Sequence, residues 1–147
     1  MARDITSDFN TAIKDTVVQP IFAIELEFSD GTLRFWTGYG DITMTAGGSS
    51  KTFTGTGDLL TISPIGESST LQMQGITVAL TGIKSSLIST ALTAQYTNRN
   101  GTLYMGLYNS SGAVIADVYT LFKGKMDVLN INEGAETSTI TLKIESR

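Results

Sequence analysis

Apolar residues at every second position are the feature of this sequence that most limits what it can fold into. Near the end of the chain, the segment STITLKIE alternates Ile140, Leu142 and Ile144 with polar residues. Successive side chains of a strand point to opposite faces, so this period of two predicts a strand with one buried face. The same pattern in QPIFAIELEF predicts another half-buried strand. Its apolar side carries Phe22, Ile24, Leu26 and Phe28, and its other side carries Ala23, Glu25 and Glu27.

Short turn sequences separate the alternating runs. The SDG sequence predicts a tight turn, and the returning segment TLRFWTG places Arg34 opposite Glu25 or Glu27. A solvated sheet face explains these charges more simply than a functional ion pair. A further hairpin is predicted from a strand at Ile42–Thr45 through AGGSS to a strand at Lys51–Thr54, and its glycines and serines indicate a mobile tip.

In two other segments, the apolar residues have the spacing of a helix. Ile5, Phe9 and Ile13 are four residues apart, which predicts a short amphipathic helix within Asp4–Thr16. Similar spacing, with serines near the start, predicts a second short helix at Ser85–Ala94.

The stretch GDLLTISPIGESSTLQMQGITVALTGI carries the strongest strand pattern of the chain. It predicts strands at Leu59–Ile62 and Leu71–Leu80, joined by a turn or bend at GESST, and a phase slip at Gly75 predicts a β-bulge. Strands at short, regular intervals, with no repeat or linker between them, indicate a single domain over residues 1–147 with a sandwich or barrel architecture.

Two absences exclude whole classes of chemistry. The chain has no cysteine and no histidine, which excludes disulfides, ordinary zinc sites, and hydrolases of the Ser-His-Asp or Cys-His type. A formal net charge of −4 argues against a nucleic-acid-binding surface. The longest apolar runs are too short to span a membrane, and the polar N-terminus lacks a signal-peptide core, so we expect assembly in a cytoplasm.

Carboxylates, glycines and aromatic residues are the remaining candidates for a site. The 14 carboxylates include many at turns, where solvation explains them more simply than a catalytic pair. Asp41 and Asp58 lack the alternating oxygen-ligand pattern of a calcium loop. The glycines of GYGDITMTAGG run into threonine-rich strands, which favours a hairpin over a phosphate loop. A sugar-binding platform is the alternative to cross-strand packing for six aromatic residues: Phe35, Trp36, Tyr39, Tyr104, Tyr108 and Tyr119.

Four segments in register resemble the baseplate-hub family of phage tails, which includes the hubs of siphophages and of gene transfer agents. They are LRFWTGYGDIT, KTFTGTGDLLTISPIGESSTLQMQGITVALTGI, LFKGKMD and EGAETSTITLKIESR. Their order and spacing agree over most of the chain. The resemblance implies a mainly β fold, namely a tail-tube-like β-barrel or sandwich with one or two short flanking α-helices. It also implies a structural protein of the virion that is not an enzyme. Because the chain has no cysteine and no histidine, we expect no metal and no cofactor.

Proteins of this family form a ring that continues the tail tube above the host-recognition proteins. We therefore expect three or six copies of this chain in a ring, between tail-tube or distal tail proteins and tip proteins, with DNA passing through the lumen without specific binding. One tube-like domain per chain favours six copies, whereas a two-domain hub needs three. Family members usually continue after ESR, and some carry cysteines that hold an iron–sulfur cluster. This sequence has neither, so it is either the first half of a longer hub or a shorter relative.

The resemblance also gives the second hairpin a role. We expect its tip to be an arm that contacts the next ring or subunit. A surface loop with no function explains the tip equally well. The tip consists of Ala46, Gly47, Gly48, Ser49 and Ser50. The acidic balance of the chain suits a channel wall along which DNA slides without sticking. A receptor- or carbohydrate-binding module of a phage tail and a small carboxylate hydrolase stay open as alternatives.

Overall fold

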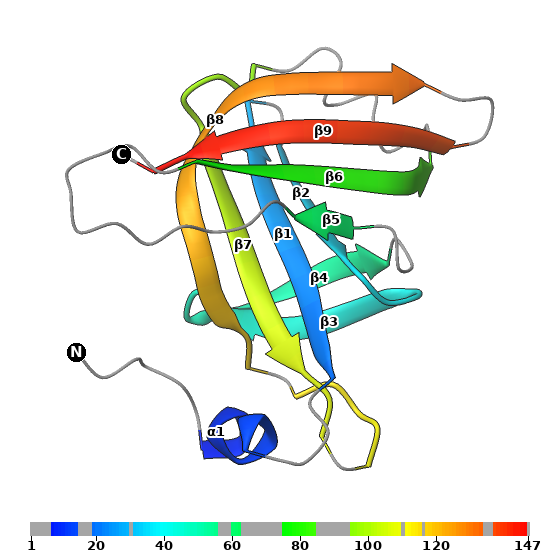
Figure 1. Cartoon of the computed structure of the whole chain (residues 1–147), viewed down its shortest axis with the longest axis vertical. Coiled ribbons are helices and arrows are strands. Elements are labelled where there is room, and N and C mark those ends of the chain that lie inside the picture. The colour runs from blue at the N-terminus through cyan, green and yellow to red at the C-terminus, as the bar shows by residue number, and fades with distance from the viewer. Residues whose placement is uncertain are drawn as a thin grey trace.

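The computed structural model describes residues 7–14, 19–29, 31–55, 60–62, 75–84, 95–109, 111–115, 117–133 and 137–146. Within these residues, one short helix, α1 (Ser7–Ile13), precedes nine strands. The strands are β1 (Pro20–Phe28), β2 (Gly31–Trp36), β3 (Asp41–Ala46), β4 (Ser49–Gly55), β5 (Leu60–Ile62), β6 (Gly75–Lys84), β7 (Asn100–Leu107), β8 (Tyr119–Glu133) and β9 (Thr137–Glu145). Figure 1 shows their arrangement, with α1 beside the lower end of the sheet.

All nine strands belong to one sheet, in the order β3-β4-β2-β1-β7-β8-β9-β6-β5. Neighbouring strands run antiparallel, except that β2 and β4 are parallel over two residue pairs. The prediction of a mainly β chain is confirmed. The predicted closure into a barrel is not seen, because within the described residues β3 and β5 form the two open ends of the sheet. The parallel pairing of β2 and β4 is short, so the β3–β4 hairpin leaves the sheet instead of extending it.

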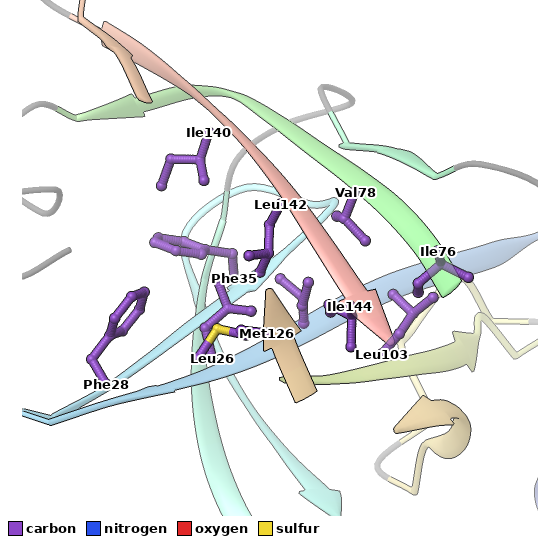
Figure 2. Packing of buried hydrophobic residues seen from close by; sticks show 11 residues of the cluster. Leu26, Phe28, Phe35, Ile76, Val78, Leu103, Met126, Ile140, Leu142 and Ile144 are labelled. Carbon is purple, nitrogen blue, oxygen red and sulfur yellow. The ribbon is translucent and has the colours of Figure 1, made fainter. Parts of the chain in front are cut away.

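The sheet curves strongly, and β8 is the strand along which it turns (Figure 1). β8 pairs with β7 through its first half and with β9 through its second half, with a register shift between Met126 and Leu129. The curvature brings the inner sides of β6 and β9 over those of β1 and β2. Figure 2 shows the core between them, in which Leu142 points toward Phe35. This core contains Ile24, Leu26, Phe28, Phe35, Ile76, Val78, Leu103, Met126, Ile140, Leu142 and Ile144.

A second core lies on the outer side of the sheet, under the β3–β4 hairpin. Met44, Ala46 and Phe53 of the hairpin pack against Ile21, Ala23, Trp36 and Tyr104. The prediction that β1 is half-buried is therefore wrong, since side chains on both of its faces are covered. Apolar and polar residues do alternate along β1, but the polar side of the strand faces the β3–β4 hairpin rather than solvent.

Glycines allow the hairpin to approach the sheet closely. The Trp36 ring lies over Gly38, where a side chain would overlap it, and the indole nitrogen donates a 2.8 Å hydrogen bond to the Gly40 carbonyl. A Cβ on Gly55 would lie 2.7 Å from the backbone nitrogen of Gly40. A side chain at Gly38 would require the Trp36 ring to move, and a side chain at Gly55 would require the backbone to move.

The remaining structural predictions have mixed outcomes. The N-terminal helix is seen as α1, within the predicted range Asp4–Thr16, whose two ends lie outside the described residues. The predicted helix at Ser85–Ala94 and the GESST bend also lie outside the described residues. Both predicted hairpins are present as β1–β2 and β3–β4. Gly75 pairs in register with Glu145, and the irregularity of β6 lies later, between Leu80 and Ile83.

Candidate functional site

A carboxylate buried beneath the hairpin is the most unusual polar feature of the described chain. Glu25 lies in the middle of β1 and is only 5% exposed. Glutamate is rarely buried unless it is paired, because removing its charge from water is costly. The surroundings of Glu25 therefore have to supply compensating charge and hydrogen bonds.

Two cations supply that compensation from different elements. Arg34, directly opposite Glu25 on β2, donates a 2.6 Å hydrogen bond from Nε to Oε2. Lys51, on β4, donates a 3.0 Å hydrogen bond from Nζ to Oε1. Each carboxylate oxygen thus accepts a charge-assisted hydrogen bond. The Glu25–Arg34 pair joins two strands that are adjacent in the sequence. The Glu25–Lys51 pair connects the β3–β4 hairpin to the sheet.

Tyr104 of β7 completes this cluster. Its hydroxyl lies 3.5 Å from both Glu25 Oε1 and Lys51 Nζ, and Lys51 Nζ lies 5.8 Å from its ring centroid. The Tyr104 ring meets Phe53 edge-on, with centroids 6.1 Å apart. Tyr104 therefore joins the ion cluster to the outer core, a geometry in which both its polar tip and its apolar ring are used.

The cluster holds Glu25 and Lys51 in their charged forms and Tyr104 in its neutral form. Burial alone would raise the pKa of Glu25, but the hydrogen bonds and positive charges of Arg34 and Lys51 outweigh it and lower that pKa below its ordinary value. Burial alone would lower the pKa of Lys51, but the hydrogen bond to Glu25 outweighs it and raises that pKa. Burial and the nearby Glu25 charge both raise the pKa of Tyr104. These directions describe a structural ion cluster rather than a group poised to exchange protons near neutral pH.

A pH dependence of stability follows from the lowered pKa of Glu25. Above pH 4.5, the ordinary value, the carboxylate is ionised in the folded and the unfolded chain, so its stabilisation is fully present. As the pH falls further, the unfolded chain binds the proton first, and the stabilisation is lost as the pH passes through the lowered pKa of the folded state. Urea denaturation from pH 7 to pH 3 should therefore show that the free energy of unfolding falls less on the acid side for Glu25→Gln than for the wild type. An equal fall in the two proteins would contradict the lowered pKa of Glu25.

A second polar row runs parallel to the first on the same outer face. Asn100 of β7 donates a 2.9 Å hydrogen bond to Glu27 Oε2 and accepts one of 2.7 Å from Lys125 Nζ. Lys123 lies two residues before Lys125 on β8, opposite Thr102, and is exposed. This row continues onto β9, where Glu145 lies opposite Lys125 and pairs with Lys143 at 2.8 Å. The outer face of the sheet thus carries cations on β2, β4, β8 and β9 among the carboxylates Glu25, Glu27 and Glu145.

The loop between β2 and β3 presents the most exposed aromatic residue of the described chain. Tyr39 is 82% exposed, and Asp41, two residues on, is also exposed. The loop beneath them is fixed, because Trp36 bonds to the Gly40 carbonyl and Thr37 N donates to the Phe22 carbonyl at 3.0 Å. The position of Tyr39 is therefore not explained by packing within the chain.

The residues predicted for a contact arm form the turn of the β3–β4 hairpin. Ala46 is fully buried in the outer core, whereas Gly47, Gly48, Ser49 and Ser50 are exposed. Gly47 and Gly48 have φ angles of 62° and 82°, which glycine adopts readily and which suit a two-residue hairpin turn. A Cβ on Gly47 would lie 3.5 Å from the Tyr104 hydroxyl, so the turn lies against the sheet. A contact between this turn and another subunit stays a prediction.

The other candidates from the sequence are not brought together. Phe35 and Trp36 are buried in different cores, and Tyr104 is buried with Trp36. Because Tyr39 is exposed on a loop, the six aromatics do not form one platform. Among the described residues, no three acidic side chains gather to hold a metal ion. None of the helices described is long and apolar enough to cross a membrane.

Lys51 and Tyr104 are the members of the cluster that sequence reasoning missed. They lie 26 and 79 residues from Glu25, so no local spacing relates them. The one available signal was a pair of acidic residues on an otherwise apolar strand.

Comparison with known proteins identifies the fold. No protein-family model matches the sequence, and the search of curated proteins finds no match. Among solved structures, the chain is similar to a chain from the virion of a native gene transfer agent particle, with a TM-score of 0.54 and 20% sequence identity. The match covers 95% of this chain and 44% of that chain, so this chain spans less than half the length of the virion chain. The likeness shows that both share a β-rich fold.

Proposed function

We propose that this chain is a structural component of a phage-type tail, in which one tail-tube-like domain per chain forms a hub or tip ring. The ring would continue the tail tube and connect it to host-recognition proteins, without catalytic activity. The observation that carries this proposal is the fold shared with a gene-transfer-agent virion chain over 95% of this chain. The four sequence segments that resemble tail hubs support it independently.

The open sheet is consistent with assembly. β3 and β5 lie at the ends of the sheet, and edge strands expose backbone groups that pair readily with another chain. In the proposed ring of three or six copies, neighbouring copies cover these edges and the exposed turn Gly47–Ser50. The acidic balance then favours a lumen through which DNA passes without specific binding.

The oligomeric state of the full chain tests this proposal. We expect light scattering at increasing concentration to reach the mass of three or six copies, and negative-stain microscopy to show rings with an open centre. The copy number would follow from the mass. A chain that stays monomeric and binds members of a glycan panel saturably would instead favour the alternative, a receptor- or carbohydrate-binding module.

A further inference from the structure

A lysine, an asparagine and a glutamate lie side by side on three neighbouring strands. Asn100 is the first residue of β7 and lies directly opposite Lys125 of β8. Glu27 of β1 lies on the other side of Asn100, one residue beyond the paired residues Leu26 and Gly101. The lysine, the asparagine and the glutamate are all half-buried. An amine, an amide and a carboxylate therefore follow one another across the sheet.

The hydrogen bonds of this row place each group against a different part of the amide. Lys125 Nζ donates a 2.7 Å hydrogen bond to Asn100 Oδ1, and Asn100 Nδ2 donates a 2.9 Å bond to Glu27 Oε2. The amine thus lies beside the carbonyl group, whereas the carboxylate lies beside the amide nitrogen. Exchange of the amide nitrogen for the amine requires this arrangement, with a nucleophile next to the carbonyl and an acid–base group within hydrogen-bond reach of the leaving nitrogen.

The backbone next to Asn100 and Lys125 holds the pair in place. Met126 N donates a 2.8 Å hydrogen bond to the Arg99 carbonyl, and Asn98 N donates a 3.0 Å bond to the Met126 carbonyl. Well-oriented groups within one molecule react as if they were present at about 10⁵–10⁸ M. Such an arrangement is what allows an amine to attack a group as unreactive as an amide. The flexible stem of lysine lets Nζ move from Oδ1 to the face of the carbonyl carbon.

A second carboxylate faces Lys125 from β9. Glu145 is the cross-strand partner of Lys125 there, and Lys143 Nζ lies 2.8 Å from Glu145 Oε1. Cross-strand partners are close enough to interact. Glu145 is therefore a base that can take up the proton which a lysine ammonium must lose before its nitrogen can attack.

We propose that Lys125 and Asn100 form an isopeptide bond within one chain, with Glu27 as the catalytic acid–base group. Nζ of the uncharged amine attacks Cγ of Asn100, and an electron pair of the carbonyl moves to Oδ1. Both nitrogens are then bonded to one carbon, so the Glu27 carboxylate beside Nδ2 takes a proton from Nζ and delivers it to Nδ2. The carbonyl re-forms, the Cγ–Nδ2 bond breaks and ammonia leaves. An amine and a primary amide thus become a secondary amide and ammonia, with no oxidant or further reactant.

The bond joins β7 and β8 covalently in each copy. It closes the chain between residues 100 and 125, and such a closure restricts the unfolded chain as a disulfide does. The chain has no cysteine, so this route to a covalent link is open to it where a disulfide is not. The inference goes beyond the proposed ring and does not depend on it, because the reaction takes place within a single copy.

Mass spectrometry of the denatured full chain tests the bond. After incubation of the purified protein, the wild type should have lost the mass of one ammonia molecule. Trypsin does not cleave after an acylated lysine, so digestion should release residues 100–123 joined to residues 124–143. Lys125→Arg should keep the full mass, because a guanidinium preserves the charge and the hydrogen bond but stays protonated and does not attack.

Two further variants separate the role of Glu27 from a structural role. Glu27→Gln keeps a side chain of the same size but cannot carry the proton, so it should slow the loss of ammonia at least about tenfold. Lys123→Arg is the matched control, since Lys123 is exposed on the same strand and lies opposite Thr102; it should lose ammonia like the wild type. The emission of the single tryptophan shows that each variant is folded. Stability measurements on Glu27 variants need the Lys125→Arg background, in which no bond forms.

Each other outcome overturns a defined part of the inference. A folded wild type that keeps its full mass after prolonged incubation has no isopeptide bond, and the row is then held by hydrogen bonds alone. Loss of ammonia that persists in Lys125→Arg also overturns the bond, because Asn100 is followed by a glycine and has then closed on its own backbone. Loss at the wild-type rate in Glu27→Gln overturns the catalytic role of Glu27. Light scattering scores the ring separately, so failure of the bond leaves the ring standing and a cross-linked monomer overturns the ring alone.

Discussion

Replacing Glu25 with alanine should lower the free energy of unfolding by about 3 kcal/mol, because it leaves two cations beneath the hairpin without their shared partner. Removing one member of a buried ion pair typically costs about 3–5 kcal/mol. The lower end applies here, since Arg34 and Lys51 keep 31% and 18% of their side-chain surface exposed and can be partly solvated. Urea denaturation followed by the fluorescence of the single tryptophan measures the effect directly.

The position of that tryptophan makes the measurement specific. Trp36 is 6% exposed and packs in the outer core with Met44 and Phe53 of the hairpin. Its emission therefore reports whether the hairpin stays on the sheet as well as whether the chain is folded.

Glu27→Ala is the matched control for Glu25→Ala. Both residues lie on the outer face of β1, but Glu27 is only partly buried and its hydrogen-bond partner here is the neutral Asn100. We expect its removal to cost less than about 1 kcal/mol. A double-mutant cycle of Glu25→Ala with Lys51→Met should give a coupling energy of about 1 kcal/mol or more, as expected for groups in contact. Equal costs for the two glutamates would show that the cluster does not hold the hairpin.

The strands of this fold were predictable because their information is local. The alternation of Ile140, Leu142 and Ile144 corresponds to a strand whose three apolar side chains are fully buried. The SDG and AGGSS sequences likewise specify turns through residues that are adjacent in the chain. Hairpins are recognisable for this reason, since a turn and its two strands lie within one short window.

The second buried face of the sheet was not predictable from such windows. Ala23 and Glu25 lie on the polar side of β1, and period-two reasoning assigns that side to solvent. The hairpin covers it because of contacts between distant segments, such as Lys51 with Glu25 and Phe53 with Tyr104. Burial of this kind is a tertiary effect, which the pattern of one strand does not contain.

The curvature of the sheet depends on a glycine that local patterns also leave unexplained. Gly124 lies within β8, where glycine weakens a strand unless the backbone is closely approached. A Cβ at this position would overlap the carbonyl oxygen of Glu145 and lie 2.7 Å from its carbonyl carbon. Gly101, its partner on β7, would place a Cβ 2.8 Å from Ile144. Two glycines therefore face each other where the end of β9 crosses the sheet.

Gly124→Ala should consequently destabilise the chain by about 3 kcal/mol, because the overlap is with backbone and cannot be relieved by a change of rotamer. For a chain of this size, that corresponds to a melting temperature roughly 6–12 °C lower.

Gly75→Ala is the control beside the same end of β9. Gly75 pairs with Glu145, but its added Cβ would lie 3.5 Å from the nearest atom, the Ile144 carbonyl oxygen, which is ordinary contact. Alanine there should be neutral or stabilise by up to about 1 kcal/mol, because it restricts the unfolded chain. Calorimetry of both variants decides between the explanations. Similar losses would mean that replacing a strand glycine is costly in β6 and β8 alike for reasons of strand geometry. A loss confined to Gly124→Ala would show that close passage of β9 over β8 sets the curvature of the sheet.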